Sequence, residues 1–186
     1  MMNSSASLAL LKQKLSSLLS SKFPGIDIDV AHSAKWNRPC VTFTSKDFAG
    51  LLPEERFQRL VTVIPTDFRE QNMAGFVWVE LAPDESLDQF LRLPRSEDVA
   101  DRASKIYGKL AAAKLFDSLE EALGASPDKR CAGNFEIMTN LLNAHHFTSE
   151  QVRDAKLLMI RHRAFCDCQI LLTAMPELAK LFSSAA

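Results

Sequence analysis

The sequence has no long apolar run and no excess of charge of either sign. None of its hydrophobic stretches approaches the roughly 20 residues that cross a bilayer, so we expect no membrane span. Its 22 basic and 23 acidic residues leave a formal net charge of −1. Binding to nucleic acid through bulk charge is therefore disfavoured, because such binding depends on basic residues that neutralise phosphates.

Recognisable catalytic motifs are also missing. The sequence contains no Walker loop for phosphate binding and no Gly-x-Ser-x-Gly turn that would present a serine nucleophile. The order of residues in the sequence does not identify a Ser-His-Asp catalytic triad. These absences favour a role without catalysis, and composition by itself does not say which role.

Cysteine is scarce, with four in 186 residues. Cys166 and Cys168 are too close in sequence for an easy mutual disulfide, and the chain is long enough to fold on its own core. This is not the pattern of a small secreted disulfide scaffold. We therefore predict reduced thiols and a cytoplasmic protein.

The first half of the chain predicts helices around a small sheet. Leucines recur at helical spacing over residues 8–19, which favours a structural first helix. The serine-rich, acid-free start also fits an organellar transit peptide, which is the alternative. Three strand patterns follow, at residues 26–30, 41–44 and 76–81. A loop is expected over residues 31–39, and helices are expected from Pro53, Thr66 and Pro83.

The second half predicts helices only. Residues 99–123 have the pattern of one long amphipathic helix that Gly108 weakens and Gly124 ends. Three more helices are expected: one capped by Asn134, one from a capping box at Thr148, and an apolar one over residues 166–182 that Pro176 breaks. The predicted fold class is therefore α+β, with a small three-stranded sheet and helices over residues 1–95 and an all-helical domain over residues 96–186.

Short motifs in the first half occur in the order found in BolA-like proteins. Phe23-Pro24-Gly25 precedes the first strand, and Ser45-Lys46-Asp47-Phe48-Ala49-Gly50 follows the second. Leu81-Ala82-Pro83-Asp84-Glu85 closes the third. Residues 7–93 therefore resemble that family, and the resemblance implies its class II KH-like fold.

The same resemblance implies a protein partner, a monothiol glutaredoxin that shares an iron–sulfur cluster with the family. The family's cluster histidine precedes its last strand, where this sequence has Met73-Ala74-Gly75-Phe76. The family's second ligand comes from the loop between the first two strands, which His32 and Cys40 flank here. We expect the scaffold of the family with a changed role.

The KH-like shape also raises the question of RNA binding. KH domains clamp the nucleic-acid backbone with a Gly-x-x-Gly loop. No two of the six glycines in this sequence are three residues apart, so we expect no nucleic-acid partner.

The densest chemical grouping is Cys166-Asp167-Cys168, preceded by His162. With the residues that follow, it resembles the Cys-Asp-Cys-x-x-Leu-Leu signature of an uncharacterised bacterial domain family, from which no activity transfers. Thiolate and imidazole are ligands for soft and borderline metals. If the preceding helix continues to Cys166, then His162 and Cys166 lie four residues apart on one face.

Cys131 precedes a predicted helix, where the helix dipole lowers a thiol pKa. Together with Cys166, Cys168 and His162 it would complete a closed Cys₃His zinc site, with His145 and His146 as alternative nitrogen donors. The opposing interpretation is that the free cysteines are small buried hydrophobes and that the histidines end helices.

Two hypotheses about function remain. The first is a non-enzymatic interaction or regulatory adaptor on the BolA-like scaffold, whose partner-binding residues lie in the first loop: His32, Lys35, Trp36 and Arg38. The second is a zinc or iron–sulfur protein that uses Cys131, His162, Cys166 and Cys168, with His32 as a further candidate ligand.

Overall fold

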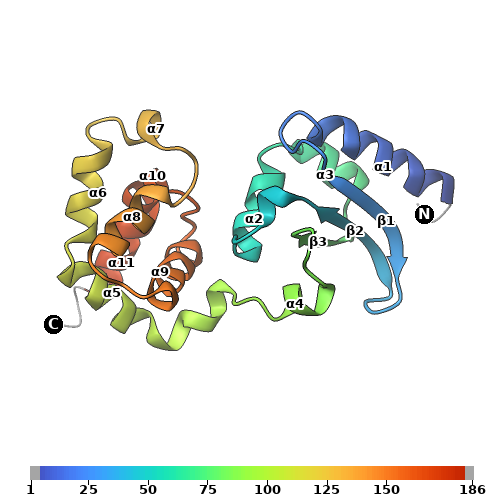
Figure 1. Cartoon of the computed structure of the whole chain (residues 1–186). Coiled ribbons are helices and arrows are strands. Elements are labelled where there is room, and N and C mark those ends of the chain that lie inside the picture. Colours follow the sequence, from blue (N-terminus) through green and yellow to red (C-terminus); the bar gives the residue numbers. More distant parts are fainter. Residues whose placement is uncertain (1–4, 183–186) are drawn as a thin grey trace. The chain divides into compact units, whose positions relative to one another are not determined.

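The structure, a computed structural model, describes residues 5–182 (Figure 1). The chain divides between Pro94 and Arg95 into two compact units, which we describe one at a time; the sequence predicted this boundary after residue 95. The first unit is α+β and the second is helical, which confirms the predicted fold class. Across the described residues, no helix combines the length and apolar character that crossing a bilayer requires.

The first unit contains a sheet of three strands in the order β1-β2-β3. β1 (Asp27–Ser33) and β2 (Arg38–Thr44) form an antiparallel hairpin, and β3 (Val77–Leu81) pairs in parallel with β2. Parallel neighbours need a crossover connection. Two helices supply it, α2 (Pro53–Val61) and α3 (Thr66–Asn72).

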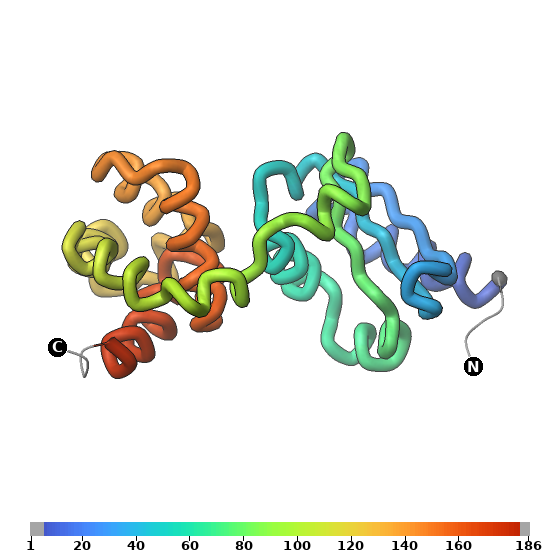
Figure 2. Tube along the Cα trace, turned by 90° about the horizontal axis from the view of Figure 1, so that it is seen from below, coloured from blue at the N-terminus to red at the C-terminus, as the bar shows by residue number. Residues whose placement is uncertain are grey.

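The first helix, α1 (Ser5–Leu19), lies alongside the hairpin in both views of the chain (Figure 1, Figure 2). Leu11, Leu15 and Leu19 recur every four residues and therefore share one face. All three are buried in a single apolar cluster with Phe43 of β2. The leucine-rich segment thus forms the structural helix that its periodicity predicted.

The loop predicted over residues 31–39 is shorter in the structure. β1 continues to Ser33, which pairs with Arg38, so only residues 34–37 make the turn. Asn37 closes that turn with a φ of 50°, a conformation that asparagine tolerates better than most residues. The expected apolar–polar alternation ends early because Ala31 and His32 are exposed on this strand. The pairing with β2 decides the length of β1.

The helix expected from Pro83 begins later, as α4 (Leu87–Leu91). Ser86 and Gln89 form a capping box: the Gln89 amide donates to Ser86 Oγ at 3.3 Å, and the Ser86 amide donates to Gln89 Oε1 at 2.7 Å. This reciprocal pair satisfies two amides at the helix start. Glu85 meanwhile pairs with Arg56 of α2.

The second unit contains no strand among its described residues, as predicted. After a 3₁₀ segment (Ser96–Arg102), its helices are α5 (Ala103–Ala112), α6 (Leu115–Leu123), α7 (Pro127–Arg130), α8 (Glu136–Ala144), α9 (Ser149–Arg161), α10 (Asp167–Gln169) and α11 (Met175–Phe182), with a π-helical turn (Ile170–Ala174) before α11. Its connections are short (Figure 1), and α6 packs against α5, α7 and α8 while α9 packs against α5 and α8.

The single long helix predicted over residues 99–123 is wrong. The chain breaks at Lys114, which has a φ of 51°, and not at Gly108. Glycine inside a helix costs only about 1 kcal/mol, which packing offsets. Leu110 before the break and Leu115 after it are both fully buried. The prediction that Gly124 ends this region is confirmed, since it caps α6 with a φ of 65°.

The predicted break at Pro176 is wrong, because the helix continues through this residue. It occupies the second position of α11, and the turn before it widens into the π-helical turn. There the Met175 amide donates to the Ile170 carbonyl, five residues back. A widened turn accommodates a proline because it moves the carbonyl that the ring would otherwise meet.

Arg56 of α2 is a buried charge at the centre of the first unit, only 2% exposed. Its guanidinium donates to the Leu51 carbonyl at 2.9 Å, to the Glu80 carbonyl at 2.6 Å and to the Glu85 carboxylate. These bonds join α2, β3 and the turn before α4. Burial opposes ionisation of Glu85, but the hydrogen bonds from Arg56 and from the Ala82 amide, together with the charge of Arg56, outweigh it, and the pKa of Glu85 is lowered.

We expect Arg56→Met to destabilise the first unit by about 3–5 kcal/mol, because it leaves the Glu85 carboxylate without its cationic partner. Urea unfolding followed by tryptophan fluorescence measures this, since both tryptophans lie in the first unit. Arg59→Met is the matched control, because Arg59 makes one 3.3 Å bond to a carbonyl. Equal losses in the two variants would contradict the assignment.

The contribution of this ion pair also depends on pH. Because the folded-state pKa of Glu85 lies below its ordinary value, the stabilisation is present above that ordinary value. It is lost as the pH falls through the folded-state pKa. The difference in stability between the unmodified chain and Arg56→Met should therefore shrink in acid.

Candidate metal centre

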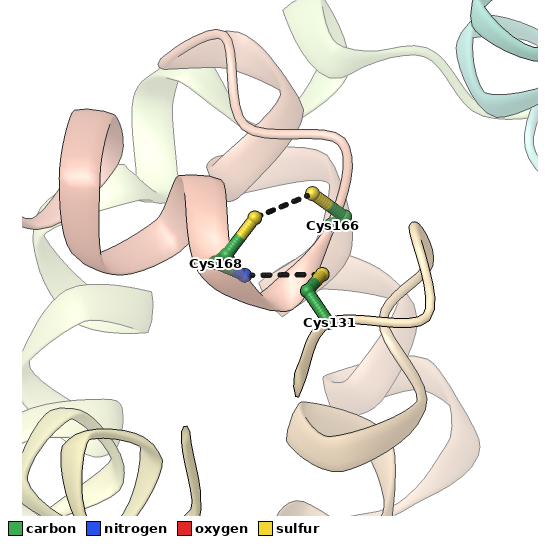
Figure 3. Close-up of side chains that lie close together, drawn as sticks. All are labelled: Cys131, Cys166 and Cys168. Carbon is green, nitrogen blue, oxygen red and sulfur yellow. Dashed lines mark hydrogen bonds between the residues drawn. The ribbon is translucent and has the colours of Figure 1, made fainter. Parts of the chain in front are cut away.

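Three of the four cysteines lie together in the helical unit (Figure 3). Cys131 lies in the loop between α7 and α8, and Cys166 and Cys168 lie at the start of α10. Their sulfur atoms are all within 4.8 Å of one another, and the Cys166 and Cys168 sulfurs are 3.4 Å apart. Segments 35 residues apart in sequence thus bring three thiols to one point.

Asp167 fixes this arrangement. It is 1% exposed, and its two carboxylate oxygens accept hydrogen bonds from the amides of Ile137 at 2.9 Å and Met138 at 3.0 Å. Those amides belong to the first turn of α8, which has no intrahelical acceptors for them. The Asp167 amide in turn donates to the Asn134 carbonyl at 2.9 Å. The cysteines on either side of Asp167 are therefore held against the loop that carries Cys131.

Asn134 completes the cap of α8. Its side-chain oxygen accepts a hydrogen bond from the Glu136 amide at 3.1 Å, although the N-cap position itself is Phe135 and not Asn134 as predicted. Local and remote acceptors together satisfy three successive amides at the start of α8. The capping role of Asp167 had only one signal in the sequence, an acidic residue between two cysteines, and the sequence analysis missed it.

The three thiols differ in acidity. Burial disfavours ionisation of Cys131, but the amides of Cys168 and Gly133 donate to its sulfur at 3.5 and 3.4 Å and outweigh burial, so its pKa is lowered. Burial raises the pKa of Cys166 to about 12 and also raises that of Cys168. Negative charge on Cys131 adds to both increases. Cys131 is therefore the first of the three to ionise.

His162 does not join the three cysteines. The helix predicted through Arg163 ends at Arg161 and does not continue to Cys166, because Arg163 has a φ of 60° and turns the chain. The Arg163 amide donates to the Ile160 carbonyl and the Ala164 amide to the Met159 carbonyl, the two bonds of a Schellman motif. The His162 ring instead lies 3.1 Å from a carboxylate oxygen of Glu177.

The alternative nitrogen donors also lie elsewhere. His145 and His146 end α8, and His146 has a φ of 59° in a second Schellman-type end. Cys131 precedes the other end of the same helix. Nine residues of helix rise about 13 Å, which separates both histidines from the thiols. Among the described residues, the metal-binding group therefore consists of cysteines alone.

The fourth cysteine, Cys40, belongs to the first unit. It is buried in β2 within a small apolar cluster that includes Val79 and Phe90. Burial raises its pKa, and the hydrogen bond with Thr42 only partly opposes this. Cys40 therefore fits the description of a small buried hydrophobe.

The residues predicted to bind a partner lie on the β1–β2 hairpin. His32, Lys35 and Arg38 are exposed, whereas Trp36 is half-buried and packs against the apolar cluster that contains Cys40. Lys35 lies 3.7 Å from a carboxylate oxygen of Asp88. Trp36 therefore has a packing role, and partner binding at this hairpin stays a prediction.

Comparison of the chain with family models, with curated proteins and with solved structures yields no match. The BolA-like resemblance of the first half and the Cys-Asp-Cys resemblance of the second both stay predictions.

We expect Asp167→Ala to destabilise the helical unit by about 1–2 kcal/mol, because two amides of α8 lose their acceptors. Thermal unfolding followed by far-ultraviolet circular dichroism measures the loss. Asp117→Ala is the matched control, since Asp117 is an exposed acid in the first turn of α6. A loss no larger than that of the control would contradict the capping role.

In reduced, metal-free protein, iodoacetamide should modify Cys131 at least about tenfold faster than Cys166 near pH 8, because the thiolate is the reactive form. Cys131 is also the more exposed of the two. Peptide mass spectrometry over a time course gives both rates. Buried Cys40 serves as a slow internal reference, and similar rates at Cys131 and Cys166 would contradict the assigned acidities.

Proposed function

We propose that the helical unit binds a thiophilic metal ion, zinc in the simplest case, through Cys131, Cys166 and Cys168. The observation that carries the proposal is the convergence of three sulfurs within 4.8 Å from two segments of the chain. Thiolate groups select zinc and other soft or borderline ions. The sequence had raised this role as its second hypothesis.

The burial of the thiols supports a ligand role over simple core filling. Free cysteines that act as small hydrophobes are among the most buried side chains, as Cys40 is. Cys131 and Cys168 are both only half-buried, although they approach Cys166 closely. Their position at the edge of the core leaves a path for an ion.

The spacing suits a zinc ion. Zinc–sulfur bonds of about 2.3 Å place the sulfurs of a tetrahedral site about 3.8 Å apart. The Cys166 and Cys168 sulfurs are separated by 3.4 Å, and no pair is separated by more than 4.8 Å. These separations lie close to that spacing, and the hydrogen bonds of Asp167 hold the backbone on either side of it.

An iron–sulfur cluster fits the donor set less well. Cubane and rhombic clusters are commonly held by four cysteines, and the fourth cysteine of this chain, Cys40, lies in the first unit. A single ion needs fewer ligands. Zinc would join the α7–α8 loop to the start of α10, so its binding energy would add to the stability of the helical unit.

Protein purified under reducing conditions with zinc present should carry about one zinc per chain. Cys131→Ser and Cys166→Ser should each reduce the zinc content severalfold, because a serine hydroxyl is a poor ligand for zinc at neutral pH. Elemental analysis gives the content, and circular dichroism establishes that each variant is folded.

Cys40→Ala is the matched control and should keep its zinc, because Cys40 lies outside the group. Zinc should also raise the thermal midpoint of the unmodified chain and leave that of Cys166→Ser unchanged. A folded, reduced protein that neither carries zinc nor gains stability from it would overturn the proposal.

A further inference from the structure

Among its described residues, the helical unit supplies three ligands to the proposed ion and no evident fourth. All four cysteines and all four histidines lie within the described residues 5–182. The metal-binding group contains none of the histidines: His162 faces Glu177, and His145 and His146 end α8.

The nearest carboxylate in sequence is also committed elsewhere. Asp167 lies between two of the cysteines, but both of its oxygens accept amide hydrogen bonds from α8. If Asp167 turned toward an ion, two buried amides would lose their acceptors, which is costly. Asp167 therefore acts as a positioning residue and not as a ligand.

Solvent reaches two of the three cysteines. Cys166 is buried, whereas Cys131 and Cys168 are both partly exposed. In the close-up, the sulfurs of Cys131 and Cys168 come from separate segments that face each other (Figure 3). Zinc sites with three protein ligands keep their fourth position for water or another exchangeable ligand, whereas structural sites with four protein ligands are closed.

On the basis of the proposed function, we infer that the bound ion keeps one coordination position open to a neutral donor from outside the chain, water at rest or an imidazole-type nitrogen. The charge of the site favours a neutral donor. Three thiolates around a divalent ion already leave one net negative charge, and a fourth anionic ligand would add a second in a partly buried site.

Cobalt(II) tests this inference, because its visible bands report the coordination geometry and its near-ultraviolet charge-transfer bands report the number of bound thiolates. Cobalt added to the reduced, metal-free full-length chain should give charge-transfer bands typical of three thiolates. Imidazole should then shift the visible bands with saturation at about one equivalent bound and leave the charge-transfer intensity unchanged, because all three cobalt–sulfur bonds persist.

Two further measurements test whether the outside ligand is neutral or anionic and whether His162 is a ligand. If a small monothiol binds the ion, the charge-transfer intensity should rise by about one third, because the number of bound thiolates rises from three to four. Such a rise without any response to imidazole would overturn the choice of a neutral donor. His162→Ala should leave the cobalt spectrum unchanged. A changed spectrum in this variant would show that His162 supplies the fourth ligand and that the position is not open.

Failure of this inference differs from failure of the proposed function. If cobalt produces no thiolate charge transfer, the chain does not bind the ion through its cysteines and the proposed function fails. If charge transfer appears but neither imidazole nor the monothiol changes the spectrum, the three-thiolate site stands and the open position does not. Cys40→Ala should behave as the unmodified chain in every arm.

Discussion

The arrangement of the helical unit's thiols depends on the hydrogen bonds between the Asp167 carboxylate and the first turn of α8. A helix start exposes amides that have no partner within the helix, and burying them without acceptors is costly. Asp167 comes from a segment 30 residues further along the chain, so satisfying the helix start draws that segment onto the α7–α8 loop. The cysteines on either side of Asp167 arrive at Cys131 as a consequence of this cap.

Three thiols this close together resist ionising at the same time. Ionisation of Cys131 makes ionisation of Cys166 and Cys168 harder, and burial works in the same direction. A divalent cation removes this resistance, because it stabilises all three thiolates at once and the thiol protons are released. The same group that resists multiple charges in the free protein is therefore complementary to a metal ion. Among the described residues, the group contains no histidine.

Patterns of local periodicity and capping predicted most of the elements. The leucine spacing of α1, the three strands and the capping box at Thr148 are all found in the structure. Two of the errors fall at helix boundaries that carry no glycine: Lys114 and Arg163 both adopt positive φ. Helix propensity gives no warning of such a boundary, because positive φ strains a side chain and is therefore uncommon outside glycine. The assumption that α9 continues past His162 is what placed that residue among the predicted ligands.

The sequence by itself determined the two-part architecture, the small sheet, and the pairing of a Cys-x-Cys run with a distant cysteine as a candidate donor set. These follow from periodicity and from the chemistry of single side chains, which are local properties. Tertiary structure alone decided that Cys131 joins Cys166 and Cys168 while His162 does not. The physical reason is that the position of these side chains depends on where α9 turns and on which remote acceptor caps α8, and both are settled by packing between segments far apart in the chain.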